Sequence, residues 1–127
     1  MEPVYLVILL ALVEYQVFAG LVGRARGKHG VKAPAVSGAP EFERVHRVHQ
    51  NTLEALIVFI PAIVIFGRYL GAHIAAAIGL VFIAARIIYA VAYIKDPEKR
   101  GPGAGLSGIA LIVLVLGALY GVIRALV

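Results

Sequence analysis

Two groups of polar side chains recur at helical spacing in an otherwise apolar chain. The first group falls within an arc of about 80° on a helical wheel and contains Arg44, Arg47, Asn51 and Glu54. The second group has spacings of three and four residues, typical of one helical face, and contains Arg86, Tyr89 and Tyr93. Guanidinium, amide, carboxylate and phenol groups arranged in this way can bind a small anionic molecule through charge-assisted hydrogen bonds.

The chain around these two stripes is too apolar for a soluble domain. Of its 127 residues, 61% are hydrophobic and only 15% are charged, whereas about a quarter are charged in an ordinary soluble domain. A small domain cannot hide so much apolar surface, because small domains bury the smallest fraction of their surface. High hydrophobicity with sparse charge also excludes a disordered chain. The composition therefore predicts an integral membrane protein.

Residue counts exclude several kinds of site. The sequence has no cysteine, which excludes a disulfide framework, a thiolate zinc site and a cysteine nucleophile. Its histidines lack convergent partners, so we expect no metal site. The net charge of +5 would suit nucleic acid in a soluble protein. In so apolar a chain it indicates cationic loops on the cytoplasmic face of a membrane, and we expect no nucleic-acid partner.

Four segments are apolar enough to cross a bilayer, which takes about 20 helical residues. We expect an all-α, integral membrane four-helix bundle. It would form a single domain over residues 1–127, with spans at about 4–24, 41–68, 72–95 and 104–125. The second helix should begin outside the lipid with its charged half, and Pro61 should kink it.

Lysine and arginine residues predict the orientation. Seven lie in the first and third connections, and two, Arg68 and Arg124, lie on the opposite side. The positive-inside rule therefore places connections one and three in the cytoplasm and both termini outside. The composition fits a bacterial inner membrane protein.

The polar stripes cannot face lipid, because a charge at the bilayer midplane costs at least about 2.5 to 3.5 kcal/mol. They must face each other, a neighbouring subunit or a water-filled ligand site. Internal pairing of Glu54 with an arginine, with the tyrosines as interface anchors, is one interpretation. It leaves a surplus, because three arginines in the two stripes meet one glutamate. The count therefore favours an anionic ligand.

The segment from Glu41 to Glu54 resembles the signature of the MAPEG superfamily, the membrane-associated proteins in eicosanoid and glutathione metabolism. The shared pattern, Glu-Arg-Val-x-Arg-x-x-x-Asn-x-x-Glu, begins here at Glu43. The resemblance continues through Arg86 and Tyr93 to Arg100, where the turn is similar to the microsomal glutathione transferase and leukotriene-C synthase branch. It implies a homotrimer with glutathione as co-substrate at each subunit interface, in the cytoplasmic half.

The same resemblance implies roles for individual residues. The glutathione-binding set would be Arg47, Asn51, Glu54, Tyr89, Tyr93 and, from a neighbouring subunit, Arg26. Arg100 would be the catalytic residue beside the thiol. The chemistry agrees, because glutathione offers carboxylates to arginines, an ammonium to Glu54 and amides to hydroxyls.

Arg44 also matches a family position, although pairing with Glu41 or Glu43 suits it equally well. Two departures from leukotriene-C synthase are Gly27, in place of a second arginine, and Ala55, in place of an aromatic contact.

We therefore expect a membrane-bound glutathione transferase, and a candidate glutathione-dependent peroxidase, that acts on hydrophobic electrophiles or lipids from the bilayer. Two alternatives stay open. A non-enzymatic lipid-binding scaffold of the same superfamily would lack the full glutathione set. A small four-helix exporter that exchanges protons for cations would use Glu14, the lone acid within the first span, but it leaves the arginines unexplained. Glu14 is better interpreted as a buried pair or an interface hydrogen bond.

Overall fold

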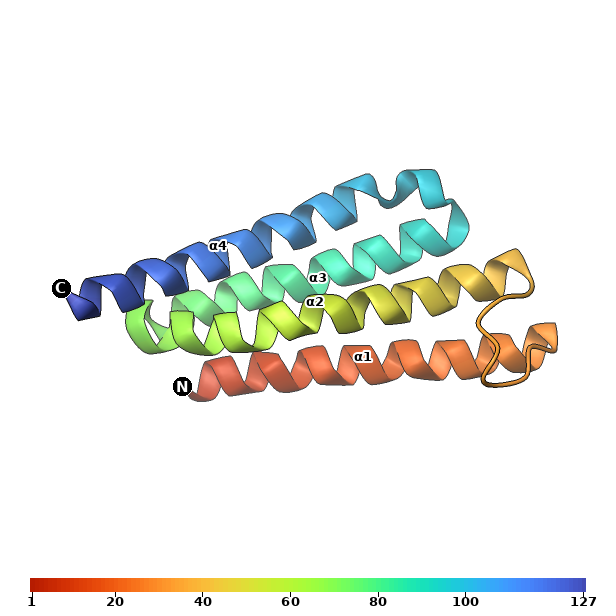
Figure 1. The fold of residues 1–127 in the computed structure, drawn as a ribbon, viewed down its shortest axis with the longest axis horizontal. Coiled ribbons are helices and arrows are strands. Elements are labelled where there is room, and N and C mark those ends of the chain that lie inside the picture. Colours follow the sequence, from red (N-terminus) through yellow and green to blue (C-terminus); the bar gives the residue numbers. More distant parts are fainter.

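The computed structural model describes all 127 residues as a bundle of four long helices that run up and down side by side (Figure 1). The helices are α1 (Glu2–His29), α2 (Pro40–Leu70), α3 (Ala72–Lys95) and α4 (Gly101–Leu126), with a short 3-10 helix, η1 (Pro97–Arg100), before α4. Each long helix is long and apolar enough to cross a membrane. The expected all-α membrane fold is therefore confirmed.

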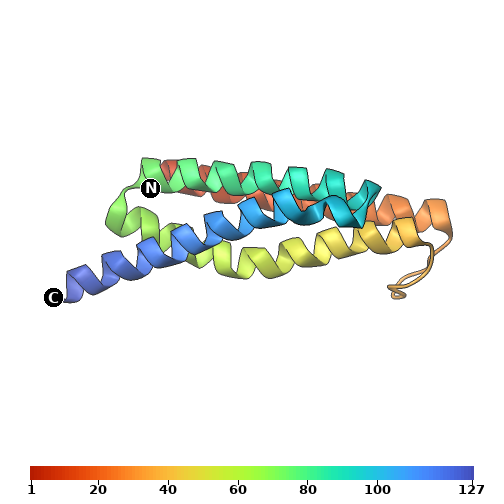
Figure 2. The same ribbon diagram turned by 90° about the horizontal axis from the view of Figure 1, so that it is seen from above.

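The helices begin and end where local chemistry allows. Gly30 caps the end of α1, and its positive φ of 66° suits a residue without a side chain. The Val31 N–H then donates a hydrogen bond to the Arg26 carbonyl at 3.1 Å. α2 begins at Pro40 with Glu41 and Glu43 in its first turn, where proline fits and acids favour the helix dipole. α2 continues through Pro61 and follows a curved path rather than breaking (Figure 2).

Two helices extend beyond the expected spans. α1 continues past residue 24 to His29, and α4 begins at Gly101 rather than at 104. Hydropathy marks the residues that suit lipid, whereas a helix ends where its backbone hydrogen bonds end. Basic side chains in the last turn of α1, such as Lys28, also favour its continuation.

The bundle core combines aromatic rings with close helix contacts. Phe59 of α2 and Phe82 of α3 are fully buried, and their rings stack with centroids 4.2 Å apart. The outer surfaces carry large apolar side chains, among them Leu6, Ile57 and Leu116. An exterior of this kind suits a lipid environment. The fold therefore buries aromatic and polar groups inside and presents aliphatic groups to the bilayer.

Glycines allow α4 to pack closely against its neighbours. A Cβ added at Gly117 or Gly121 would overlap Phe66 or Tyr69 of α2, so this pair of small residues lets α4 pack closely against α2. A Cβ added at Gly103 would overlap the backbone of Tyr89 in α3. Backbone atoms cannot rotate aside, which makes Gly103 the least tolerant of these contacts.

Gly103→Ala should lower the free energy of unfolding by about 1 to 3 kcal/mol, the usual cost of forcing an extra methyl group into packed surroundings. Gly105→Ala is the matched control, because the added Cβ there has open space and alanine favours helix by up to about 1 kcal/mol. Thermal unfolding in mild detergent measures both variants. Equal midpoints for the two variants would contradict the close contact.

Candidate active site

A polar pocket lies at the end of the bundle where α2 begins and α3 ends. Its volume is about 440 Å³. It is lined by Val36, Pro40, Glu43, Arg44, His46, Arg47 and Tyr93. The first half of α2 supplies most of these side chains, because its charged residues follow one another at helical spacing. Arg47 and Tyr93, from the two polar stripes, therefore share one pocket.

The two tyrosines of α3 link this pocket to the bundle interior. Tyr89 is buried, Tyr93 is half-buried, and their rings stack with centroids 5.5 Å apart. The guanidinium of Arg86 lies 4.4 Å from the centroid of the Tyr89 ring, and Arg47 lines the pocket together with Tyr93. Side chains from α2 and α3 therefore converge around this pair of rings, whereas Arg100 lines a separate hollow with Pro97, Glu98 and Gly101.

Arg86 is an internal tie and not a free cation. Its Nη2 donates to Asn51 Oδ1 at 2.8 Å and to Thr52 Oγ1 at 2.9 Å. Its guanidinium lies 4.4 Å from the centroid of the Tyr89 ring, within the range of a cation–π contact. Glu14 of α1 is also buried and lies at the same level of the bundle, because Phe18, one turn after it, shares a buried cluster with Ala90, one turn after Arg86. The stripe on α3 therefore binds the stripe on α2 directly.

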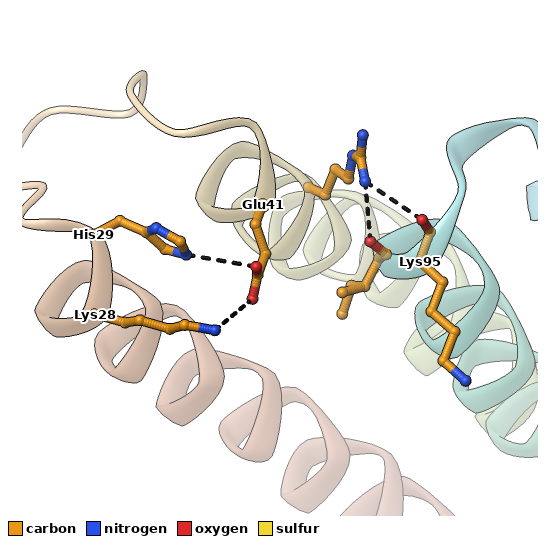
Figure 3. A network of polar contacts seen from close by, with 6 residues as sticks. Lys28, His29, Glu41 and Lys95 are labelled. Carbon is orange, nitrogen blue, oxygen red and sulfur yellow. Dashed lines mark hydrogen bonds and ion pairs between the residues drawn. The ribbon is translucent and has the colours of Figure 1, made fainter.

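Arg44 does not pair with Glu41 or Glu43, so that expectation is wrong. Its Nη1 donates to the carbonyls of Ile94 at 3.3 Å and Lys95 at 3.4 Å, and Figure 3 shows the Lys95 carbonyl accepting this bond. The last carbonyls of a helix have no partner within the helix, so a nearby guanidinium satisfies them. Arg44 thereby joins the start of α2 to the end of α3.

The two glutamates have other partners. Glu41 forms ion pairs with Lys28 at 3.4 Å and with His29 at 3.7 Å, both from the end of α1 (Figure 3). Glu43 accepts a hydrogen bond from the Gly38 N–H at 3.1 Å. Both carboxylates therefore hold the first connection to the helix ends, and neither neutralises an arginine.

The charge count from the sequence needs correction. Arg44 binds backbone carbonyls, and Arg86 binds Asn51 and Thr52, so two of the three arginines are not available to a ligand. Glu54 pairs with no arginine. Among the charged residues predicted for the site, Arg47, Glu54 and Arg100 are exposed and have neither an ion pair nor a side-chain hydrogen bond. Exposed charges of both signs suit a zwitterionic ligand.

A tight turn places Arg100 at the start of α4. Asp96 ends α3, and its Oδ1 accepts a hydrogen bond from the Glu98 N–H at 3.1 Å, while Pro97 begins η1. Arg100 then follows as the residue before α4. The contact between Gly103 and Tyr89 keeps this turn against α3. Two local constraints therefore fix the turn that carries Arg100 against α3, and the Arg100 side chain lines a hollow with Pro97, Glu98 and Gly101.

Arg26 lies apart from the pocket of its own chain. Its Nη1 donates to the Ala35 carbonyl at 2.6 Å, and its guanidinium lies 5.0 Å from the centroid of the Phe42 ring. These contacts hold the first connection against α2. Arg26 does not line the pocket that contains Arg47 and Tyr93.

Comparison with known proteins decides the family. Residues 4–120 match the family described as the MAPEG family. The chain belongs to the MAPEG family. Microsomal glutathione S-transferase 2 of Mus musculus is 44% identical over 112 residues, covering 87% of this chain and 76% of the relative. Leukotriene C4 synthase of Cavia porcellus is 33% identical over 117 residues, covering 92% and 78%. An uncharacterized protein of Synechocystis is 43% identical over 118 residues, covering 93% and 86%.

Sequence reasoning about this MAPEG protein missed one residue of the site. Thr52 is fully buried and accepts a hydrogen bond from Arg86. The available signal was a hydroxyl one position after Asn51, on the face of α2 that also carries the apolar core residues. A buried hydroxyl requires a partner, and among the helices of this MAPEG protein a buried arginine provides it.

Proposed function

We propose that this MAPEG protein is a membrane-bound glutathione transferase that joins glutathione to hydrophobic electrophiles from the bilayer. The observation that carries the proposal is the pocket that unpaired Arg47 shares with Tyr93, whose ring stacks on Tyr89. The relatives named glutathione S-transferase and leukotriene C4 synthase support the same chemistry.

Glutathione fits the exposed groups of this face. Its carboxylates can accept hydrogen bonds from Arg47, and its ammonium can pair with Glu54, one turn further along α2 than Asn51. The hydroxyl of Tyr93 can bond an amide or carboxylate of the peptide. The alternative of a lipid-binding scaffold would not require charges of both signs on this face.

The reaction needs the thiolate, because the thiolate is the nucleophile. A guanidinium beside the sulfur favours the anion, and the thiol proton passes to water. The thiolate then attacks the electrophilic carbon, so that the sulfur–carbon bond forms as the leaving group departs with its electron pair. With a hydroperoxide as the acceptor, the same thiolate would attack the terminal oxygen while the O–O bond breaks, and the alkoxide that leaves would take a proton from water. A second glutathione would then attack the sulfur of the sulfenic acid and displace water, which gives glutathione disulfide and completes a peroxidase reaction.

Conjugation with an activated aryl chloride tests the proposed function. The purified protein in detergent should form the glutathione thioether and release chloride at a rate that saturates with both substrates. A scaffold would bind lipid without consuming thiol. Absence of any enzyme-dependent thioether with several chloride and epoxide acceptors would overturn the proposal.

We also propose that the protein acts as a homotrimer. Glu54 lies 16 residues before the end of α2 at Leu70, or about 24 Å along the helix, and therefore within a hydrocarbon layer about 30 Å thick. An exposed carboxylate at that depth must be covered by a neighbouring subunit or a ligand. Arg26 lies outside its own pocket, and its bond to Ala35 uses only Nη1, so its other N–H groups can serve the pocket of a neighbour.

Chemical cross-linking in mild detergent should therefore yield bands up to a trimer and no larger. Light scattering of the detergent complex should give the mass of three chains. A monodisperse monomer or dimer that still binds glutathione would contradict this assembly.

The proposed location is a bacterial inner membrane with both termini outside. The basic side chains at the end of α1 and in η1 support this orientation, and the relative from Synechocystis supports a bacterial source. Because the chain has no cysteine, single cysteines at position 35 or 127 can be labelled selectively. An impermeant thiol reagent applied to intact cells should label position 127 and not position 35.

A further inference from the structure

A buried polar cluster lies beneath the exposed face of the site. It joins three helices through Glu14 of α1, Asn51 and Thr52 of α2, and Arg86 of α3. Glu14 is 8% exposed and Arg86 is 3% exposed. Buried charges of this kind are costly inside a membrane bundle unless they oppose each other. None of the proposed chemical steps uses either charge.

Arg86 determines how Asn51 is oriented. The Asn51 Oδ1 accepts the 2.8 Å hydrogen bond from Arg86 Nη2, so the amide presents its NH₂ group, with two donors, away from Arg86. The second bond, to the Thr52 hydroxyl at 2.9 Å, prevents the guanidinium from rotating. Asn51 is half-buried, so its amide remains partly accessible as a hydrogen-bond donor.

Arg86 also supports the ring of Tyr89. Its guanidinium lies 4.4 Å from the ring centroid, and Tyr89 stacks in turn on Tyr93, which lines the pocket. One buried guanidinium thus contacts two groups of the candidate site, the Asn51 amide and the Tyr89 ring. Moving it would disturb both at once.

Glu14 opposes this guanidinium. Neither carboxylate oxygen of Glu14 has a hydrogen-bond partner, and the Nε of Arg86 has none. Phe18, one turn after Glu14 in α1, lies in the same buried cluster as Ala90, one turn after Arg86 in α3, so Glu14 and Arg86 lie at the same level of two helices that contact each other. No ion pair within 4 Å joins Glu14 to any residue. Glu14 is therefore the group that balances Arg86 inside the bundle.

We propose that Glu14 and Arg86 are a positioning pair for the glutathione site. Glu14 holds the guanidinium of Arg86 in the bundle, and Arg86 orients the Asn51 amide and the Tyr89 ring toward the ligand. The proposal rests on the proposed function. Neither residue touches the reacting atoms, so the pair sets the affinity for glutathione and not the rate of sulfur transfer.

Removal of the Glu14 charge should release Arg86. With no anion opposite it, the guanidinium is attracted to the pocket, and the bonds to Asn51 and Thr52 are lost. Glu14→Gln should therefore raise the glutathione dissociation constant about tenfold, the equivalent of one or two hydrogen bonds. The turnover number at saturating glutathione should stay within about threefold. Glu2→Gln, at the only other acid of α1, is exposed and should change neither value.

A double-mutant cycle separates positioning from a purely structural role. Arg86→Met should weaken glutathione binding about tenfold, and Glu14→Gln should add nothing in the Arg86→Met background, because Glu14 acts only through Arg86. The double variant leaves neither buried charge unpaired and should fold even where Glu14→Gln alone does not. Calorimetric titration with glutathione measures all four proteins, and thermal unfolding records their stability.

Three outcomes are distinguishable. Unchanged glutathione affinity in the folded variants, with or without lower stability, would overturn the positioning role alone. Additive losses in the double variant would show that Glu14 and Arg86 act separately, and would also overturn it. Absence of glutathione binding by the unmodified protein would overturn the proposed function and this proposal together.

Discussion

Arg100→Ala should lower the turnover number by about 100-fold, as expected for loss of a fixed charge that stabilises a developing anion. The affinity for glutathione should change by less than about threefold, because Arg47 and Glu54 would still hold the ends of the peptide. Arg100 is exposed and unpaired in the chain, and it lies three residues before Gly103, which packs against Tyr89.

The physical reason is the acidity of the thiol. A thiol with a pKa near 8.5 is only a few per cent ionised at pH 7. A cation within about 4 Å of the sulfur lowers that pKa. Without Arg100 the thiol pKa should return toward its ordinary value, so the midpoint of the pH–rate profile should shift upward. Thiolate absorbance near 240 nm reports the ionisation of bound glutathione directly.

Lys99→Ala is the matched control for Arg100→Ala. Lys99 is adjacent in η1 and equally exposed, so general loss of positive charge at this end would affect both variants alike. Only Arg100→Ala should shift the thiolate titration. Thiolate formation at the same pH in Arg100→Ala and the unmodified protein would show that Arg100 does not activate the thiol.

Arg47→Ala and Glu54→Gln should each weaken glutathione binding by about 1.5 to 3 kcal/mol, the contribution of a hydrogen bond to a charged group. Both side chains are exposed and have no ion pair within the chain. Their removal therefore leaves no unpaired buried partner, and the effect should fall on the ligand rather than on the fold. Calorimetric titration with glutathione gives the dissociation constants.

Arg68→Ala is the control at the other end of α2. Its guanidinium lies 5.6 Å from the centroid of the Tyr69 ring, far along the helix from Arg47. It should leave glutathione affinity unchanged. Similar losses at Arg47, Glu54 and Arg68 would indicate a general effect on stability and would count against a specific site.

Much of the fold followed from local patterns in the sequence. Hydropathy located four helices, and the predicted start of the second, at about residue 41, falls one residue after Pro40. Helical spacing grouped Asn51 and Arg86 in two stripes and left three possible neighbours for each stripe, and in the structure these two residues contact each other. The exact ends of α1 and α4 were not predictable, because hydropathy reports lipid contact and not the last backbone hydrogen bond.

The partners of individual charges could not be predicted from spacing. Neighbours along a helix are visible in the sequence, so Glu41 and Glu43 were natural partners for Arg44. The carbonyls that it binds instead, at Ile94 and Lys95, arrive only when α3 packs against α2. The opposition of Glu14 and Arg86 likewise depends on how α1 and α3 meet in the bundle.

Thermal unfolding of the detergent-purified protein with and without glutathione tests the central claim most directly. Glutathione at 100 times its dissociation constant should stabilise the protein by about 2.7 kcal/mol, and Arg47→Ala should require a higher concentration for the same shift. No stabilisation at saturating glutathione would contradict a glutathione site. Stabilisation by lipophilic cations instead, abolished by Glu14→Gln, would favour the exporter.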